Sequence, residues 1–294
     1  MKTLFTLILI LQFSLKIFSQ GVDYQYDSKH IPEIKQATMY IIPTGDKNFD
    51  DSLNHYISKF WKITPYKIIR RDEADLLLKE ESNYFLAAVP RLGNDGYGTN
   101  STVVVPDNVS SNSIYIFHGS KKSKLKNIEY QDALYCRLPF YGEKNYAAGL
   151  AYVVKNLNDN VELLINLLNS NKIAEINRPS KEWIPTMRTE LSKRANLIKG
   201  KTLLIDTKAL DIHLKEKVLT GCKCPYKIVT TSEMLSLLNS QPEKYCFLAA
   251  SANMDIYDAE SKNLIFTTNT LTASGSIQIL EKHIQKLNSS IEKP

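Results

Sequence analysis

The chain has 294 residues, of which 43% are hydrophobic and 23% charged, and its net charge is +6. This composition excludes collagen-like, mucin-like and wholly disordered chains, and the length suits two ordinary domains. The charge excess is small, and the dense basic run at residues 120–126 contains no aromatic side chain on which a base could stack. We therefore expect no nucleic-acid partner.

Residues 1–19 have the pattern of a secretion signal. Lys2 gives a positive start, and residues 4–11 form a largely apolar run. That run has the length of a signal peptide, whereas a helix that spans a bilayer takes about twenty apolar residues. We expect cleavage between Ser19 and Gln20 and export to the periplasm or the extracellular space. An uncleaved amino-terminal anchor is the alternative, and no integral membrane span is expected once the signal is removed.

Residues 20–158 read as the first α/β domain, because apolar runs of strand length alternate with segments of helical periodicity. The run at residues 84–88 is apolar at every position, which is typical of a strand that helices cover on both faces of a sheet. The predicted strands are 39–42, 66–69, 84–89, 102–105 and 114–117; the predicted helices are one capped by Asp51, a short one at 73–79 and a closing one at 146–157.

Residues 159–200 predict a mostly helical connector, which continues the apolar stripe of the closing helix after a possible break at residues 158–160. Pro185 suits a helix start, and Gly200 stands where a helix would end. Residues 201–294 read as the second α/β domain. Its predicted strands are 202–205, 226–229, 245–250 and 264–267, and its closing helix is 274–287.

The two domains share short motifs in the same order, which indicates an internal duplication. Accordingly, the sequence predicts an α/β fold of two tandem, internally duplicated domains, each with a mixed sheet flanked by helices, joined by a helical bridge. The matched segments are Pro65-Tyr66-Lys67-Ile68 with Pro225-Tyr226-Lys227-Ile228, Phe85–Ala88 with Phe247–Ala250, Tyr40–Pro43 with Leu203–Asp206, and Leu157-Asn158 with Leu287-Asn288.

The strand Tyr66-Lys67-Ile68-Ile69, the charged pair Arg70-Arg71 after it and the apolar strand at residues 84–88 form a pattern known from envelope proteins. It resembles the small α/β domains of the curli-export lipoprotein family and the amino-terminal domain of the Tol-system periplasmic protein. Such domains often place glycine after the third strand, where this chain has Val89-Pro90, and the lipid-attachment cysteine is absent. The resemblance implies an envelope-associated, non-enzymatic role and carries over no functional residue.

Few residues suggest chemistry. No pair of histidines, nor of glutamate and histidine, has the spacing of a helical metal site, so we expect no metal and no cofactor. His118 follows a predicted strand, and the glycine-rich run at residues 93–100 precedes it in the same domain. We name Asn94, Asp95, Tyr97 and His118 as candidate ligand contacts; the alternative is ordinary turn chemistry.

The chain has four cysteines, and an exported protein can oxidise them. If the second and third strands of the second domain are neighbours, Cys224 and Cys246 come close to bridging distance, whereas one intervening strand separates them by roughly 10 Å. We expect a Cys224–Cys246 disulfide. A strained Cys222–Cys224 bridge and four free thiols are the alternatives.

These features favour a non-catalytic binding or interaction protein whose partner is an envelope protein or polymer. The first alternative is a small-molecule sensor or binding protein that holds its ligand between the two domains, near the carboxyl ends of the strands. A hydrolase that uses His118 or Cys136 is the last. The sequence carries no complete catalytic constellation that would favour this third reading.

Overall fold

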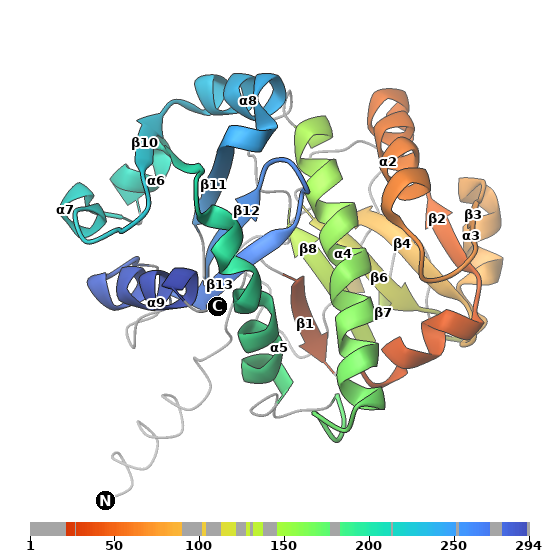
Figure 1. Cartoon of the computed structure of the whole chain (residues 1–294). Coiled ribbons are helices and arrows are strands. Elements are labelled where there is room, and N and C mark those ends of the chain that lie inside the picture. The colour runs from red at the N-terminus through yellow and green to blue at the C-terminus, as the bar shows by residue number, and fades with distance from the viewer. Residues whose placement is uncertain are drawn as a thin grey trace, which may run out of the picture. The chain divides into compact units, whose positions relative to one another are not determined.

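The computed structural model describes residues 22–26, 28–89, 102–103, 113–121, 128–129, 132–137, 146–176, 183–212, 214–250, 253–270 and 278–292 (Figure 1). Two compact units are present, a first unit at Val22–Glu190 and a second unit that includes Leu191–Pro294. Each contains a mixed sheet flanked by helices, and a helical segment lies between the two sheets in the sequence. This confirms the predicted fold class. The expected signal at residues 1–19 lies outside the described residues.

The sheet of the first unit has the strand order β1-β8-β6-β4-β2-β3. Strand β2 runs parallel to β3 and β4, and the other neighbours are antiparallel. A separate two-stranded sheet joins β5 and β7. The elements are β1 (Val22–Tyr26), η1 (Ser28–Gln36), β2 (Met39–Ile42), α2 (Lys47–Phe60), β3 (Tyr66–Ile68), α3 (Arg71–Leu77), β4 (Tyr84–Val89), β5 (Thr102–Val103), β6 (Ser113–His118), β7 (Ile128–Glu129), β8 (Asp132–Arg137), α4 (Tyr146–Asn169) and α5 (Trp183–Ser192).

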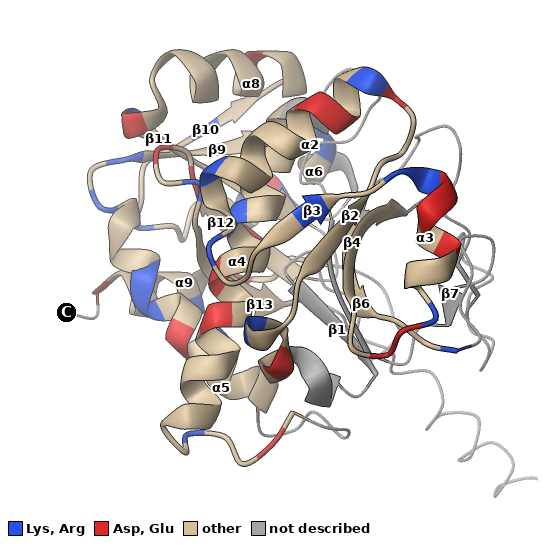
Figure 2. Ribbon diagram, turned by 90° about the vertical axis from the view of Figure 1, so that its right-hand side faces the viewer, with Lys and Arg blue, Asp and Glu red and all other residues tan. Residues whose placement is uncertain are grey.

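Alternate residues of β4 face opposite sides of this sheet, and helices cover both sides. Leu86 belongs to a core shared with α2 and α4, whereas Phe85 belongs to a core shared with α3. Figure 2 shows α2 and α3 on opposite sides of these strands. Because both faces are buried, the strand is apolar at every position, as its sequence predicts.

Helix α2 begins earlier than its sequence suggests. Asp46, not Asp51, is the N-cap: its carboxylate accepts hydrogen bonds from the backbone N–H groups of Asn48, at 2.9 Å, and Phe49, at 3.0 Å. Asp51 lies within the helix and pairs with Lys47. The prediction for Asp51 was wrong because several aspartates lie close together, and the cap is decided by which carboxylate reaches the free N–H groups.

Helix α4 runs through residues 158–160 without a break. Asn158 is buried inside the helix, and its Oδ1 accepts a hydrogen bond of 2.8 Å from the backbone N–H of Lys62. One of the polar residues that suggested an end to the helix, Asn158, therefore makes a tertiary contact instead. Of the helices that the structure describes, none combines the length and apolarity that a bilayer crossing needs.

The second unit has a five-stranded sheet in the order β10-β9-β11-β12-β13. Its closing helix starts at Glu281, later than the expected residue 274, and the unit contains a strand, β12, that was not expected from the sequence. The elements are η2 (Lys193–Ile198), β9 (Thr202–Asp206), α6 (Thr207–Ile212), α7 (Glu216–Leu219), β10 (Tyr226–Val229), α8 (Thr231–Ser240), η3 (Pro242–Lys244), β11 (Tyr245–Ala250), β12 (Asn253–Asp258), β13 (Leu264–Asn269) and α9 (Glu281–Glu292).

The predicted connector at residues 159–200 divides between the two units. Trp183 and Met187 of α5 belong to the core of the first unit, whereas Ala195 and Ile198 of η2 belong to the core of the second. Gly200, which follows η2, has a positive φ of 80°. This conformation suits glycine at a helix end, as the sequence indicates.

The two sheets share one topology. The order β3-β2-β4-β6-β8 in the first unit corresponds to β10-β9-β11-β12-β13 in the second, and each corresponding pair of neighbours is parallel or antiparallel alike. The closing helices α4 and α9 follow the last of these strands in each unit. The predicted duplication is therefore visible in the order and direction of the strands.

Hydrogen bonds fix the residue-by-residue match of the first strands. The N–H of Met39 donates to Pro65 O at 2.9 Å, and the N–H of Leu203 donates to Pro225 O at 2.8 Å. Met39 is thus the counterpart of Leu203. The sequence match of Tyr40 with Leu203 was wrong by one residue, and in a strand one residue reverses the face that a side chain points to.

Side-chain contacts repeat between the units as well. The rings of Phe85 and Phe117 stack with centroids 5.6 Å apart, and those of Phe247 and Tyr257 stack at 5.2 Å at the corresponding places on β11 and β12. The buried Asn288 of α9 accepts a hydrogen bond of 2.9 Å from the N–H of Lys223, as Asn158 does from Lys62. The duplication thus includes a buried asparagine that holds the loop before the second strand.

Candidate functional site

His118 is the one candidate ligand contact that the structure describes. It ends β6, it is half-buried, and its Nδ1 lies 2.7 Å from Gly119 O. Asn94, Asp95 and Tyr97 lie outside the described residues. The counterpart of His118 in the second unit is Asp258, since each is paired with the same position of the neighbouring strand.

The turn after His118 is tightly packed. A Cβ atom at Gly119 would lie 2.1 Å from Glu80 O, which no side chain can satisfy without moving the backbone. The N–H of Gly119 donates to Asn83 O at 2.8 Å, and the N–H of Ser120 donates to Leu78 O at 2.8 Å. Close packing against the backbone therefore explains why a glycine follows His118, and the sequence of this turn does not need a bound ligand to explain it.

Asp258 takes part in an ion pair. The Lys201 ammonium lies 2.6 Å from one Asp258 oxygen and 3.1 Å from Glu260, and the side chains of Lys201 and Asp258 are 14% and 4% exposed. Burial acts to lower the pKa of Lys201, but its hydrogen bonds to the two carboxylates outweigh burial and raise that pKa. Asp258 also accepts hydrogen bonds from the N–H and the hydroxyl of Ser261. The group is fully partnered, so we assign it a structural role.

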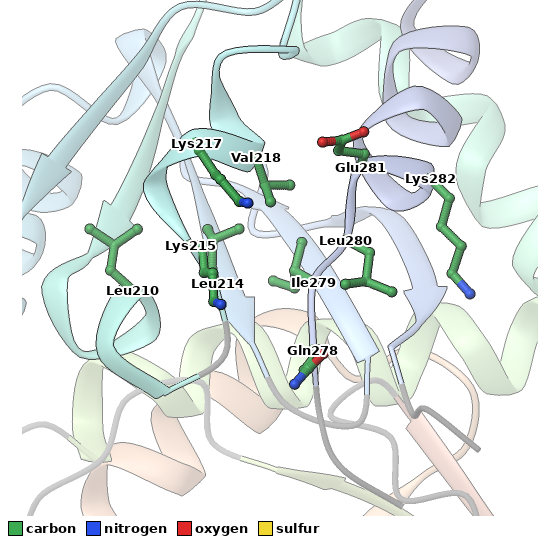
Figure 3. Close-up of a pocket in the computed structure, with 10 residues that line it drawn as sticks. All are labelled: Leu210, Leu214, Lys215, Lys217, Val218, Gln278, Ile279, Leu280, Glu281 and Lys282. Atoms are coloured by element: carbon green, nitrogen blue, oxygen red, sulfur yellow. The ribbon is translucent and has the colours of Figure 1, made fainter. Parts of the chain in front are cut away.

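A pocket of about 500 Å³ lies within the second unit. Figure 3 shows its two walls: one comprises α6, α7 and the segment between them, and the other is the stretch that leads into α9. A backbone bridge between Leu214 and Ile279 joins the walls at one point. The apolar lining consists of Leu210, Leu214, Val218, Ile279 and Leu280.

The connection between the first two strands differs between the two units. In the first unit this connection contains the unbroken helix α2, which buries Phe49, Leu53 and Ile57 against the sheet and α4. In the second unit it contains two short helices, α6 and α7, whose buried side chains include Ala209 and Val218. The pocket of the second unit thus lies beside two short helices, in the connection where the first unit has α2.

Charged groups surround the apolar lining. Lys215, Lys217 and Lys282 supply positive charge, and Glu281 supplies one negative charge. In Figure 3 Lys217 extends from α7 toward the centre of the pocket, whereas Lys282 points away from the other lining residues. The pocket thus combines an apolar floor with an excess of positive charge, which suits an apolar molecule that carries an anionic group.

One wall of the pocket depends on a buried histidine. His283 is 5% exposed, and its Nδ1 accepts a hydrogen bond of 3.0 Å from the N–H of Leu280 at the start of α9. Burial, together with the positive charges of Lys282 and Lys286, lowers the pKa of His283. The neutral ring, with its proton on Nε2, therefore fixes the entry into α9.

Three thiols belong to the same core of the second unit. Cys246 is fully buried, Cys224 is 7% exposed and Cys222 is half-buried, and all three are free. Strand β9 lies between β10, which follows Cys224, and β11, which contains Cys246. This is the arrangement with one intervening strand, which separates Cys224 from Cys246 by roughly 10 Å and counts against the expected Cys224–Cys246 disulfide. Within the described part of the chain, no cluster of three or more His, Cys, Asp or Glu side chains is arranged to hold a metal ion.

No family model, curated protein or solved structure matches the chain. The resemblance to envelope domains therefore stays an expectation from the sequence. The pocket was not foreseen, because its apolar lining residues occur in two segments that the sequence does not connect. One sequence feature could have pointed to it. The segment after the first strand of the second domain lacks a long helical periodicity like that at residues 47–60.

Proposed function

We propose that the chain is an exported, non-catalytic binding protein and that its second unit takes a small apolar ligand with an anionic group. The observation that carries this proposal is the pocket of about 500 Å³ between α6–α7 and the start of α9. A volume in this range is typical of small-molecule sites. The pocket lies wholly in the second unit, so this proposal differs from a site between the two domains.

The ligand class follows from the lining. An alkyl chain placed against Leu214, Val218 and Ile279 gains about 25 cal/mol for each Å² of apolar surface that leaves water. The anionic group of such a ligand pairs with Lys217 and Lys215, which are exposed and lie in the pocket lining. The apolar contacts supply most of the affinity, and the lysines select the anion.

The export that we propose agrees with this ligand class. Outside the cytoplasm, amphiphiles with a carboxylate or another anionic headgroup are released from membrane lipids and are poorly soluble in water. A protein that buries the alkyl chain keeps such a molecule in solution. The partner in this reading is a small molecule, and an envelope protein or polymer is the alternative that the experiment below distinguishes.

Calorimetric titration of the full chain with decanoate tests the proposal. We expect saturable binding with one site per chain, weaker binding of decanol, which lacks the charge, and weaker binding of decyltrimethylammonium, whose charge is opposite. Lys217→Glu should weaken decanoate binding about tenfold, whereas Lys244→Glu, on η3 outside the pocket, should leave it unchanged. No saturable binding of any of the three amphiphiles would contradict the proposal and favour a macromolecular partner.

A further inference from the structure

The loop Gly221–Cys224 is built on a scaffold that the two units share. In the second unit, Asn288 accepts a hydrogen bond from Lys223 N–H at 2.9 Å and donates one to Gly221 O at 2.8 Å. These two bonds hold the backbone on either side of Cys222. In the first unit Asn158 accepts the corresponding bond from Lys62 N–H at 2.8 Å.

The side chains on this scaffold differ between the units. Trp61 and Thr64 stand just before Lys62 and Pro65 in the first unit, where the Trp61 Nε1–H donates to Thr64 O at 3.1 Å. Cys222 and Cys224 stand just before Lys223 and Pro225 in the second. The loop that an indole closes in one unit therefore carries two thiols in the other.

The two thiols differ in accessibility and acidity. Cys222 is half-buried and Cys224 is 7% exposed. A hydrogen bond from the Cys224 thiol lowers the pKa of Cys222 to about 7, and the same interaction, followed by burial, raises the pKa of Cys224. A thiol with such a pKa is substantially ionised near neutral pH, and the thiolate is the nucleophile in thiol chemistry.

We propose that Cys222 and Cys224 form a reversible redox pair, with Cys222 as the attacking thiol and Cys224 as the resolving thiol. The external partner is a small-molecule or protein disulfide. The Cys222 thiolate attacks one sulfur of that disulfide and displaces the other as a thiolate, which leaves a mixed disulfide. The Cys224 sulfur then attacks Cys222 Sγ and displaces the second external thiolate, which takes up the proton that Cys224 releases. Two protein thiols are oxidised to one disulfide, and one external disulfide is reduced to two thiols.

Cys246 is placed differently. It is fully buried, its Sγ–H donates to Thr202 O at 3.8 Å, and burial raises its pKa to about 12. Strand β9 separates it from the strand that follows Cys224. Cys246 therefore has neither the access nor the acidity of an attacking thiol.

The sequence allows the pairing to be read directly. Trypsin cleaves after Lys217, Lys223 and Lys227, so Cys222 and Cys224 fall in separate peptides, 218–223 and 224–227. The full chain is equilibrated with reduced and oxidised dithiothreitol at a series of ratios, trapped with N-ethylmaleimide and digested. We expect these two peptides to be joined by a disulfide at oxidising ratios and separate and alkylated at reducing ratios.

Three variants complete the test. Cys246→Ser should leave the joined peptides unchanged, whereas Cys222→Ser and Cys224→Ser should each abolish them, with circular dichroism to show that the variants are folded. The iodoacetamide reaction of Cys222 should be half-maximal near pH 7 in Cys246→Ser, and this midpoint should rise by more than one unit in Cys224→Ala. A bridge from Cys246 to either loop thiol, or alkylation of both loop thiols at every ratio, would overturn the proposal.

Discussion

Replacement of Asn288 by alanine tests the buried asparagine that both units share. The change removes the acceptor for Lys223 N–H and the donor to Gly221 O. A buried backbone group that loses its partner costs about 1–3 kcal/mol. Because the loop residues are partly exposed and water reaches some of the freed groups, we take about 1 kcal/mol for each, or about 2 kcal/mol together. Alanine regains about 0.6 kcal/mol of helix propensity, which leaves a loss of about 1.4 kcal/mol.

Two variants serve as controls for this prediction. Ser289→Ala changes the exposed neighbour on α9 and should not destabilise the second unit. Asn288→Asp keeps the acceptor for Lys223 but sets a carboxylate oxygen against Gly221 O in place of the donor, so it should be less stable than the wild type. The three together separate the hydrogen bonds from the helix propensity.

Denaturant titration with two local probes follows each unit. Trp61 and Trp183, the chain's two tryptophans, both lie in the first unit, so their fluorescence reports on that unit. Labelling of the buried Cys246 thiol reports on the second. Asn288→Ala should shift the Cys246 labelling midpoint to lower denaturant. A shift no larger than that of Ser289→Ala would refute the claim that Asn288 holds the loop.

Three further predictions concern charge, pH and processing. Lys201→Met should destabilise the protein by about 3 kcal/mol, as measured by urea unfolding, because it leaves the Asp258 carboxylate buried without its counter-charge; an effect below 0.5 kcal/mol would contradict this. Because the pKa of His283 is lowered, the stability that its neutral ring contributes is complete above about pH 6.5 and is lost as the pH falls below that value. The difference in melting temperature between the wild type and His283→Asn should therefore change between pH 7 and 5, and a constant difference would exclude this role. Mass spectrometry of exported protein should find Gln20 at the amino terminus; an intact Met1 on exported material would count against the signal.

The sequence predicts the strands well where apolar runs are continuous. Strands β2, β4 and β11 have the expected bounds, because no charged residue interrupts their apolar runs; β10 also has the expected bounds, although Lys227 lies within it. Strand β12 was missed since Asn253, Asp255 and Asp258 interrupt its apolar pattern, yet all three are buried. Their burial depends on tertiary surroundings that a local pattern does not contain.

The local sequence pattern also fails to fix the match between the two units where several alignments of their strands pair apolar residues equally well. Leu203, Leu204 and Ile205 match the first strand of the other unit almost equally well in two registers, and the hydrogen bonds to Pro65 and Pro225 select one. The pocket escaped prediction for a related reason. Its lining comes from two segments, residues 210–218 and 278–282, that are far apart in the sequence and meet only in the folded unit.

Photo-crosslinking tests the central claim, the anion-selective pocket of the second unit, most directly. The full chain is irradiated with an alkyl carboxylate that carries a diazirine in its chain, and the adducts are located by mass spectrometry. We expect adducts to concentrate at residues 210–218 and 278–282 and excess decanoate to remove them. Adducts confined to the first unit, or spread over the chain and insensitive to decanoate, would contradict it.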